Sequence, residues 1–229
     1  MSLIRRSFAD RQQLAEALAD AVAADLKAGA SARGAASMAV SGGTTPAGFF
    51  RALARRGDVP WDKVVVTLVD ERWVDESSDR SNGRLVRANL LQGRAASARF
   101  VPLYQGGQAP DTAKAAQAFA SVPAPLDAAI LGMGNDGHTA SFFPGGDRLH
   151  EALTADGPIV AITAPGAGEP RVTLTLKRLL GARALYLHIE GEEKAKTLAR
   201  AEEGGPVEDM PVRAIVGQTQ KPVTIYWCP

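Results

Sequence analysis

Val64-Val65-Val66-Thr67-Leu68-Val69 forms a continuous, mostly β-branched run in the first third of the chain. A strand with one solvated face alternates between apolar and polar residues, and this run does not alternate in that way. Strands that are covered on both faces have this composition, and they are typical of parallel sheets. The run therefore predicts a buried strand in a parallel sheet.

Short apolar segments alternate with amphipathic ones on either side of this run. Leu14, Leu18, Val22 and Leu26 stand four residues apart, which places them on one stripe of a helix. Strands that alternate with helices imply βαβ units. We therefore expect one α/β domain over residues 1–229, with a mostly parallel central sheet and helices on both faces. The expected strands are 37–40, 64–69, 99–103, 127–131, 159–163, 171–176, 184–189 and 223–227, and the further expected helices are 45–56, 81–91, 112–121 and 192–201.

Length and composition describe an ordinary globular chain. It has 229 residues, 45% of them hydrophobic and 22% charged, and a formal net charge of +1. We therefore expect no nucleic-acid partner. The one cysteine, Cys228, excludes an internal disulfide and a multi-cysteine metal cluster. Since no signal-like or membrane-spanning apolar segment is found, we expect a cytoplasmic protein without a membrane partner, either a monomer or a small homo-oligomer.

Ligands of such sheets bind beyond the carboxyl ends of the strands, so the segments that follow strands are the candidates for a site. Ser41–Pro46 lies between an expected strand and an expected helix. Gly42 and Gly43 allow a sharp turn that brings N–H groups close to a ligand, and the hydroxyls of Thr44 and Thr45 add donors. Together with the helix dipole they predict an anion site, with a plain turn as the alternative. No Walker A sequence follows.

Asp70-Glu71-Arg72 follows the valine-rich strand directly. The guanidinium of Arg72 is permanently charged and planar, which suits a phosphate, a carboxylate or a developing oxyanion. Asp70 and Glu71 are expected to position Arg72 rather than to act as catalysts. A local ion pair at the rim of the sheet is the alternative.

Gly132–Ser141 also follows an expected strand and contains the formal pattern G-x-G-x-x-G. A dinucleotide site is disfavoured, because the acidic residue about twenty positions further on, Asp156, falls in an Asp-Gly-Pro turn. His138 comes directly after the glycines, where it can act as a general acid or base, and a structural role is the alternative.

Two basic residues and two further histidines are the remaining candidates for functional side chains. Arg171 and Lys194 are either binding residues or ordinary surface charges. His150 is expected in a polar loop and His188 inside a strand, both with structural roles. The histidines show no i, i+4 pair, so no metal site is predicted.

Taken together, these segments resemble the 6-phosphogluconolactonases over nearly the whole chain. The matching segments, in the same order as in that family, are Ser41–Pro46, Asp70-Glu71-Arg72 with Ser81-Asn82, Leu131–Ser141 with Phe143-Pro144-Gly145, Arg171–Leu176 and Gly191–Ala195. The resemblance implies a Rossmann-like three-layer sandwich. It also implies an enzyme of the oxidative pentose phosphate pathway that hydrolyses 6-phospho-D-glucono-1,5-lactone to 6-phospho-D-gluconate, with no cofactor and no required metal.

For such a substrate we hypothesise three groups of site residues. The phosphate would be held by Gly42, Gly43, Thr44 and Thr45, with added charge from Lys194 and Arg171 across the cleft. His138 would activate water, and Asp136 would orient His138 or bind a sugar hydroxyl. Arg72 would stabilise the oxyanion of the tetrahedral intermediate, or grip the phosphate instead.

The alternatives are a glucosamine-6-phosphate deaminase or isomerase, a non-catalytic sugar-phosphate sensor and, more distantly, a dinucleotide-dependent oxidoreductase. Deaminases typically carry a Glu where this chain has Phe143, and Asp-Glu-Tyr where it has Asp70-Glu71-Arg72. Both departures favour the lactonase. A sensor of this kind would be expected to carry a DNA-binding segment and a basic patch, and this chain is nearly neutral.

Overall fold

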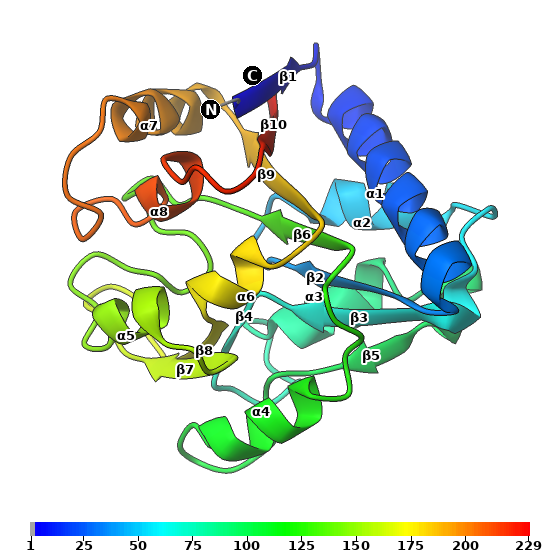
Figure 1. The fold of residues 1–229 in the computed structure, drawn as a ribbon, viewed down its shortest axis with the longest axis horizontal. Coiled ribbons are helices and arrows are strands. Elements are labelled where there is room, and N and C mark those ends of the chain that lie inside the picture. Colours follow the sequence, from blue (N-terminus) through cyan, green and yellow to red (C-terminus); the bar gives the residue numbers. More distant parts are fainter. Residues whose placement is uncertain (1–2) are drawn as a thin grey trace.

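The structure, a computed structural model, describes residues 3–229 and is built on a seven-stranded parallel sheet (Figure 1). Every pairing in this sheet is parallel, and all five residues of β3 are buried, as the valine-rich run predicted. The strands, in spatial order, are β1 (Leu3–Ser7), β10 (Val223–Cys228), β9 (Ala184–Glu190), β6 (Ala128–Leu131), β2 (Ala36–Val40), β3 (Val64–Leu68) and β5 (Arg99–Val101).

Helices cover both faces of this sheet, as predicted. In Figure 1, α1 (Arg11–Arg33) and α2 (Ala47–Ala54) lie on one side of it, and α7 (Glu192–Glu202) and α8 (Arg213–Val216) lie on the other. The stripe residues of α1 are fully buried against the sheet. The remaining helices are α3 (Asn82–Asn89), α4 (Thr112–Phe119), α5 (Leu149–Thr154) and α6 (Leu176–Leu180). Among residues 3–229, no helix combines the length and the apolar composition that crossing a membrane requires.

A second, three-stranded antiparallel sheet is the main departure from the expected fold. It consists of β4 (Asp70–Arg72), β8 (Arg171–Leu174) and β7 (Ile159–Ile162). Strands β7 and β8 were expected as strands, but not as a separate sheet. Strand β8 is shorter than the expected 171–176 because α6 begins at Leu176. The pairing of β4 with β8 sets Arg72 opposite Arg171, a proximity that no local sequence pattern indicates.

Smaller differences have local causes. Strand β1 was not expected, because it is a largely exposed edge strand with two arginines that pairs only with β10. Helix α2 begins at Ala47 rather than at residue 45, and His150 lies exposed in α5 rather than in a loop. Ser81 caps α3 as predicted, since its hydroxyl accepts a hydrogen bond from the Arg84 N–H.

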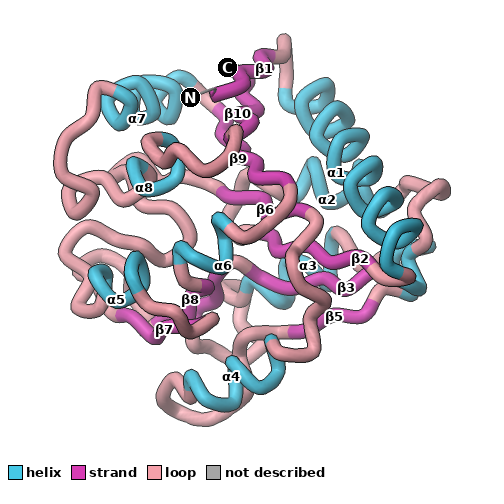
Figure 2. The backbone as a smooth tube through the Cα atoms, viewed as in Figure 1, coloured by secondary structure: helices cyan, strands magenta, loops and turns pink. Residues whose placement is uncertain are grey.

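The order of the strands determines where a ligand can bind. From β2 the chain proceeds outward through β3 and β5, then returns to β6 on the other side of β2 and proceeds through β9 and β10. The carboxyl ends of β2 and β6 therefore lie side by side where the winding direction reverses, which is the usual position of a ligand in open α/β sheets. The loop that follows β6 runs between α8 and α5 (Figure 2).

Candidate active site

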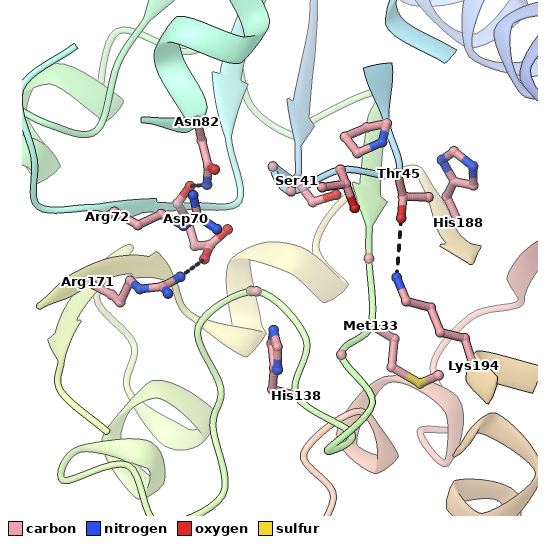
Figure 3. A pocket seen from close by; sticks show the side chains of 17 residues that line it. Ser41, Thr45, Asp70, Arg72, Asn82, Met133, His138, Arg171, His188 and Lys194 are labelled. Carbon is pink, nitrogen blue, oxygen red and sulfur yellow. Dashed lines mark hydrogen bonds and ion pairs between the residues drawn. The ribbon is translucent and has the colours of Figure 1, made fainter. Parts of the chain in front are cut away.

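A pocket of about 300 Å³ lies at this reversal point (Figure 3). Eight of the nine predicted site residues line it, and Asp136 is the exception. The eight are Gly42, Gly43, Thr44, Thr45, Arg72, His138, Arg171 and Lys194. The sequence analysis did not assign Ser41, Pro46, Asp70, Asn82, Gly132, Met133, Gly134, Ala140 or His188 to the site, and they line it as well.

The glycine turn after β2 forms one wall of the pocket. Gly43 has a φ of 91°, a left-handed conformation that favours glycine. A Cβ on Gly42 would lie 1.8 Å from Oδ1 of Asn82, so the turn packs against this side chain without room for a methyl group. Gly43 and Thr44 are exposed at the pocket. The turn therefore presents its backbone to the cavity.

Lys194 reaches this turn from the first turn of α7. Its Nζ donates to Oγ1 of Thr45 over 3.2 Å, and the contact is drawn in Figure 3. Burial lowers the pKa of Lys194, and the nearby charge of Glu190 opposes that effect. A partly buried cation beside a strand-to-helix turn makes this side of the pocket suitable for an anion.

His138 faces the pocket from the loop after β6. Its Nδ1 lies 2.6 Å from Oδ1 of Asp136, and its backbone N–H donates to the same oxygen over 3.1 Å. Burial alone would raise the pKa of Asp136, but hydrogen bonds and the charge of His138 outweigh it and lower the pKa. An ionised Asp136 accepts only, so Nδ1 carries a proton in both charge states of His138, and in the neutral imidazole Nε2 has a free lone pair. The alternative in which Asp136 orients His138 is therefore the one that the geometry favours.

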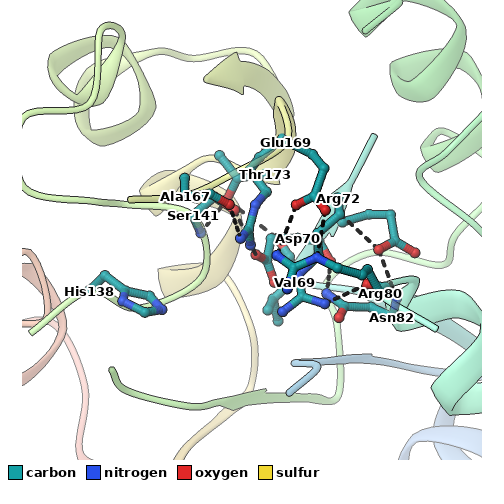
Figure 4. A network of polar contacts seen from close by, with 12 residues as sticks. Val69, Asp70, Arg72, Arg80, Asn82, His138, Ser141, Ala167, Glu169 and Thr173 are labelled. Atoms are coloured by element: carbon teal, nitrogen blue, oxygen red, sulfur yellow. Dashed lines mark hydrogen bonds and ion pairs between the residues drawn. The ribbon is translucent and has the colours of Figure 1, made fainter. Parts of the chain in front are cut away.

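The two arginines lie side by side at the other wall, where β4 pairs with β8 (Figure 3), and the polar contacts around Arg72 are drawn in Figure 4. Arg171 is buried; its Nη1 lies 3.7 Å from Oδ2 of Asp70, and its Nη2 donates to the Ala167 carbonyl over 2.7 Å. Burial lowers the pKa of Arg171, and Asp70 opposes that effect. Arg171 lies across the pocket from Lys194 (Figure 3), whereas both residues were expected on the side of the cleft opposite the glycine turn.

The prediction that Asp70 and Glu71 position Arg72 is confirmed only in part. Oε1 of Glu71 accepts from the backbone N–H of Arg72 over 2.8 Å, whereas the hydrogen bonds and ion pairs of the described residues join neither carboxylate to the Arg72 guanidinium. The Glu71 carboxylate accepts from the backbone N–H groups of Asn82 and Gly83, so it holds the start of α3. Asp70 accepts from Ser141 Oγ over 2.6 Å and pairs with Arg171. The Arg72 guanidinium donates instead to the backbone carbonyl of Arg80. Because Asp70 and Arg72 are close in the sequence, an ion pair between them was an expected alternative. The antiparallel pairing of β4 with β8 brings Arg171 to Asp70 instead.

Unpaired polar atoms converge on the same pocket. Within residues 3–229, four buried side-chain nitrogen or oxygen atoms have no hydrogen-bond partner, and all four belong to residues that line this pocket. Buried polar atoms are rarely left without a partner, so this concentration indicates that a polar ligand completes the site. The four atoms are Arg72 Nε, Asn82 Oδ1, Arg171 Nε and His188 Nδ1.

His188 only partly fits its expected structural role. It is buried in β9, and its Nε2 lies 3.2 Å from Oε1 of Glu190, but its Nδ1 is one of the four unpaired atoms. In residues 3–229 no group of three or more His, Cys, Asp or Glu side chains is arranged to hold a metal ion.

The fold and the site define a doubly wound α/β protein whose pocket joins a glycine turn, suited to an anion, to the imidazole of His138. The family model described as "Glucosamine-6-phosphate isomerases/6-phosphogluconolactonase" matches residues 9–227. The chain belongs to this family.

Two relatives and one solved structure show how close the similarity is. The chain is 54% identical to a 6-phosphogluconolactonase of Rhizobium meliloti (strain 1021), over 100% of both chains. It is 51% identical to a 6-phosphogluconolactonase of Mesorhizobium japonicum, over 97% of this chain and 94% of the relative. The crystal structure of a 6-phosphogluconolactonase from Shewanella baltica superposes with a TM-score of 0.97 at 39% identity, covering 100% of this chain and 98% of that one.

Proposed function

We propose that this chain hydrolyses 6-phospho-D-glucono-1,5-lactone to 6-phospho-D-gluconate. The observation that carries the proposal is a pocket that holds His138, oriented by Asp136, together with an anion-binding turn and Lys194. The names of the relatives support the same reaction. It serves the oxidative branch of the pentose phosphate pathway.

The substrate phosphate binds the turn at Gly42–Thr45 in this proposal. A phosphate carries a charge of about −1.5 to −2 at neutral pH. Backbone N–H groups, the Thr44 and Thr45 hydroxyls and the start of α2 all favour such an anion. Lys194 and Arg171 flank the turn from opposite walls and add charge. This anchoring fixes the position of the lactone carbonyl relative to His138.

His138 then acts as the general base. Its Nε2 takes a proton from water as the water oxygen attacks the lactone carbonyl carbon. The tetrahedral intermediate collapses, the bond from this carbon to the ring oxygen breaks, and the imidazolium returns the proton to that oxygen. Arg72 stabilises the negative charge on the former carbonyl oxygen through its free Nε–H.

The alternative functions lack comparable support. At the position where a deaminase typically has a glutamate, Phe143 places an apolar ring against His138. After β6 the G-x-G-x-x-G segment continues into turns rather than a helix, so it lacks the helix N-terminus of a dinucleotide site. Ammonia release from glucosamine 6-phosphate would favour the deaminase.

The proposal is tested by measuring formation of 6-phosphogluconate in a coupled assay, above the spontaneous hydrolysis of the lactone. We expect a rate proportional to the concentration of the protein. If 6-phosphogluconate forms no faster with the protein than without it, the proposed function is wrong.

Replacing Lys194 with Met is expected to raise KM far more than it lowers kcat. A hydrogen bond to a charged group contributes about 1.5–3 kcal/mol, which corresponds to roughly 10- to 150-fold in KM. Phosphate binding is uniform through the reaction, so its loss appears in KM. Lys196→Met is the matched control, because Lys196 lies on the same helix and pairs only with exposed Glu193. Equal effects of both substitutions would contradict the role of Lys194.

Replacing Gly134 with Ala is expected to lower kcat by displacing the base. A Cβ at this position would lie 2.2 Å from both Nδ1 and Cε1 of His138, so the imidazole must move. A shift of about 1 Å in a reacting group can cost on the order of 100-fold in rate. Gly157→Ala is the control, since a Cβ there meets nothing within 4 Å. Normal turnover by the Gly134 variant would show that the position of the imidazole is not critical.

Four further expectations stay predictions: the single domain, the location, the oligomeric state and the absence of a required metal. We propose that residues 1–229 act as one domain, which a single cluster of buried apolar residues running from Leu14 to Cys228 supports. We also propose a cytoplasmic location and a monomer or small homo-oligomer that needs no metal.

A further inference from the structure

Phe143 contacts both the base and one of the two arginines. The centroids of the Phe143 and His138 rings are 4.3 Å apart with 30° between the planes, so the rings are stacked. The Cζ atom of Arg171 lies 5.1 Å from the centroid of the same phenylalanine ring. Phe143 is only 5% exposed, so its ring has little freedom to leave these contacts.

The loop after β6 is folded so that Phe143 returns to His138. The Phe142 N–H donates to the Thr139 carbonyl over 2.9 Å, and the Gly146 N–H donates to the Phe143 carbonyl over 3.1 Å. Ala140, which lies in the turn between Thr139 and Phe142, adopts a φ of 48°, a left-handed conformation that is unfavourable for alanine. Such strain persists only where the surrounding structure enforces it, and it is common at functional sites.

The hydrogen bond to Asp136 holds only the Nδ1 edge of the imidazole. Because the Asp136 side chain is half exposed, it can move together with the imidazole when His138 turns about its Cβ–Cγ bond, and Nε2 then turns away from the substrate. A stacked ring removes this rotation, because aromatic pairs have preferred plane orientations. Since a general base must point its lone pair at the water proton, the orientation of the plane affects the rate.

We propose that Phe143 is a positioning residue that fixes the plane of the His138 imidazole and at the same time holds the Arg171 guanidinium against the pocket. This inference rests on the proposed function. Phe143 touches neither the reacting atoms nor the phosphate. It acts through the stack on His138 and through the cation–π contact with Arg171.

The test compares three substitutions by steady-state kinetics and thermal unfolding. Phe143→Leu keeps an apolar side chain but removes the ring, and we expect kcat to fall and KM to rise, each by about 3- to 10-fold. Phe143→Tyr keeps the ring and is expected to restore both values to within about twofold of wild type. Phe142→Leu is the matched control, because Phe142 is fully buried and makes no aromatic contact with His138. It should lower the unfolding temperature and leave kcat nearly unchanged.

A spectroscopic measurement keeps the proposal testable without turnover. The Phe143 ring current should shift the Cε1 proton of His138 upfield in the wild-type NMR spectrum, and replacing Phe143 with Leu should remove the shift. An unshifted proton in the wild-type protein overturns the proposal even if the Leu variant does not fold. Lactone hydrolysis with unchanged kcat and KM in Phe143→Leu overturns it too, while the proposed function stands. A wild-type protein that is inactive but shows the ring-current shift refutes the function and leaves the stacking intact.

Discussion

Replacing His138 with Asn is expected to lower kcat by about 100- to 10,000-fold and to leave KM nearly unchanged. A positioned general base typically supplies a rate factor of this size. Asn keeps a polar side chain of similar reach, but it has no group that takes a proton from water near neutral pH. The phosphate contacts at the opposite end of the pocket are untouched, so binding of the substrate should persist.

The stability of the folded protein should change little in this variant. The His138 side chain is 30% exposed, and its hydrogen-bond partner Asp136 is half exposed and can be solvated by water. The readout is 6-phosphogluconate formation corrected for spontaneous hydrolysis, with thermal unfolding measured on the same samples. His150→Asn is the control, because His150 is exposed on α5 and does not line the pocket. Turnover within about twofold of wild type would remove His138 from the mechanism.

Replacing Arg72 with Met is expected to lower kcat by about 100- to 1000-fold, the cost of losing one well-placed oxyanion donor. The Nε atom of Arg72 is buried without a protein partner, so it is available to a ligand. The hydrogen bond from its guanidinium to the Arg80 carbonyl holds the side chain in place before substrate arrives. An oxyanion forms only in the intermediate, so the loss should appear in kcat rather than in KM.

This variant separates the two roles that the sequence left open for Arg72. A rise in KM with kcat maintained would assign Arg72 to the substrate phosphate and contradict the oxyanion role. Arg84→Met serves as the control, because Arg84 is an exposed arginine of α3 that donates to the Ser77 carbonyl outside the pocket. It should retain wild-type kcat and KM.

Local sequence patterns were sufficient for six of the seven strands of the central sheet and for most of the pocket, and the exposed edge strand β1 was missed. The composition of the run at 64–69 predicts a buried strand and the two glycines predict a tight turn, although both also depend on distant contacts: the pairing of β3 with β2 and β5, and the packing of Gly42 against Asn82. The position of the pocket followed from a general rule of parallel sheets. The glycine turn follows β2 and the segment with His138 follows β6, and these two strands are neighbours in space.

The missed contacts of Asp70 join residues distant in the sequence. Asp70 precedes Arg72 by two positions, but its partners are Ser141 and Arg171. No periodicity encodes the antiparallel pairing of β4 with β8, which creates these contacts. In the sequence, Phe143 stood out only as part of a matching segment and as a departure from the deaminases, and its stacking on His138, five residues away, depends on a strained turn at Ala140.

The adjacency of β2 and β6 has a consequence for how the protein matures. These two strands are neighbours in space, yet β3, β5 and the helices between them intervene along the chain. During translation the glycine turn at residues 41–46 is synthesised well before His138, and Lys194 is synthesised later still. In the proposed mechanism, partial products of translation therefore lack part of the site, and activity requires that distant parts of the polypeptide meet, a step that is slow for non-local pairing.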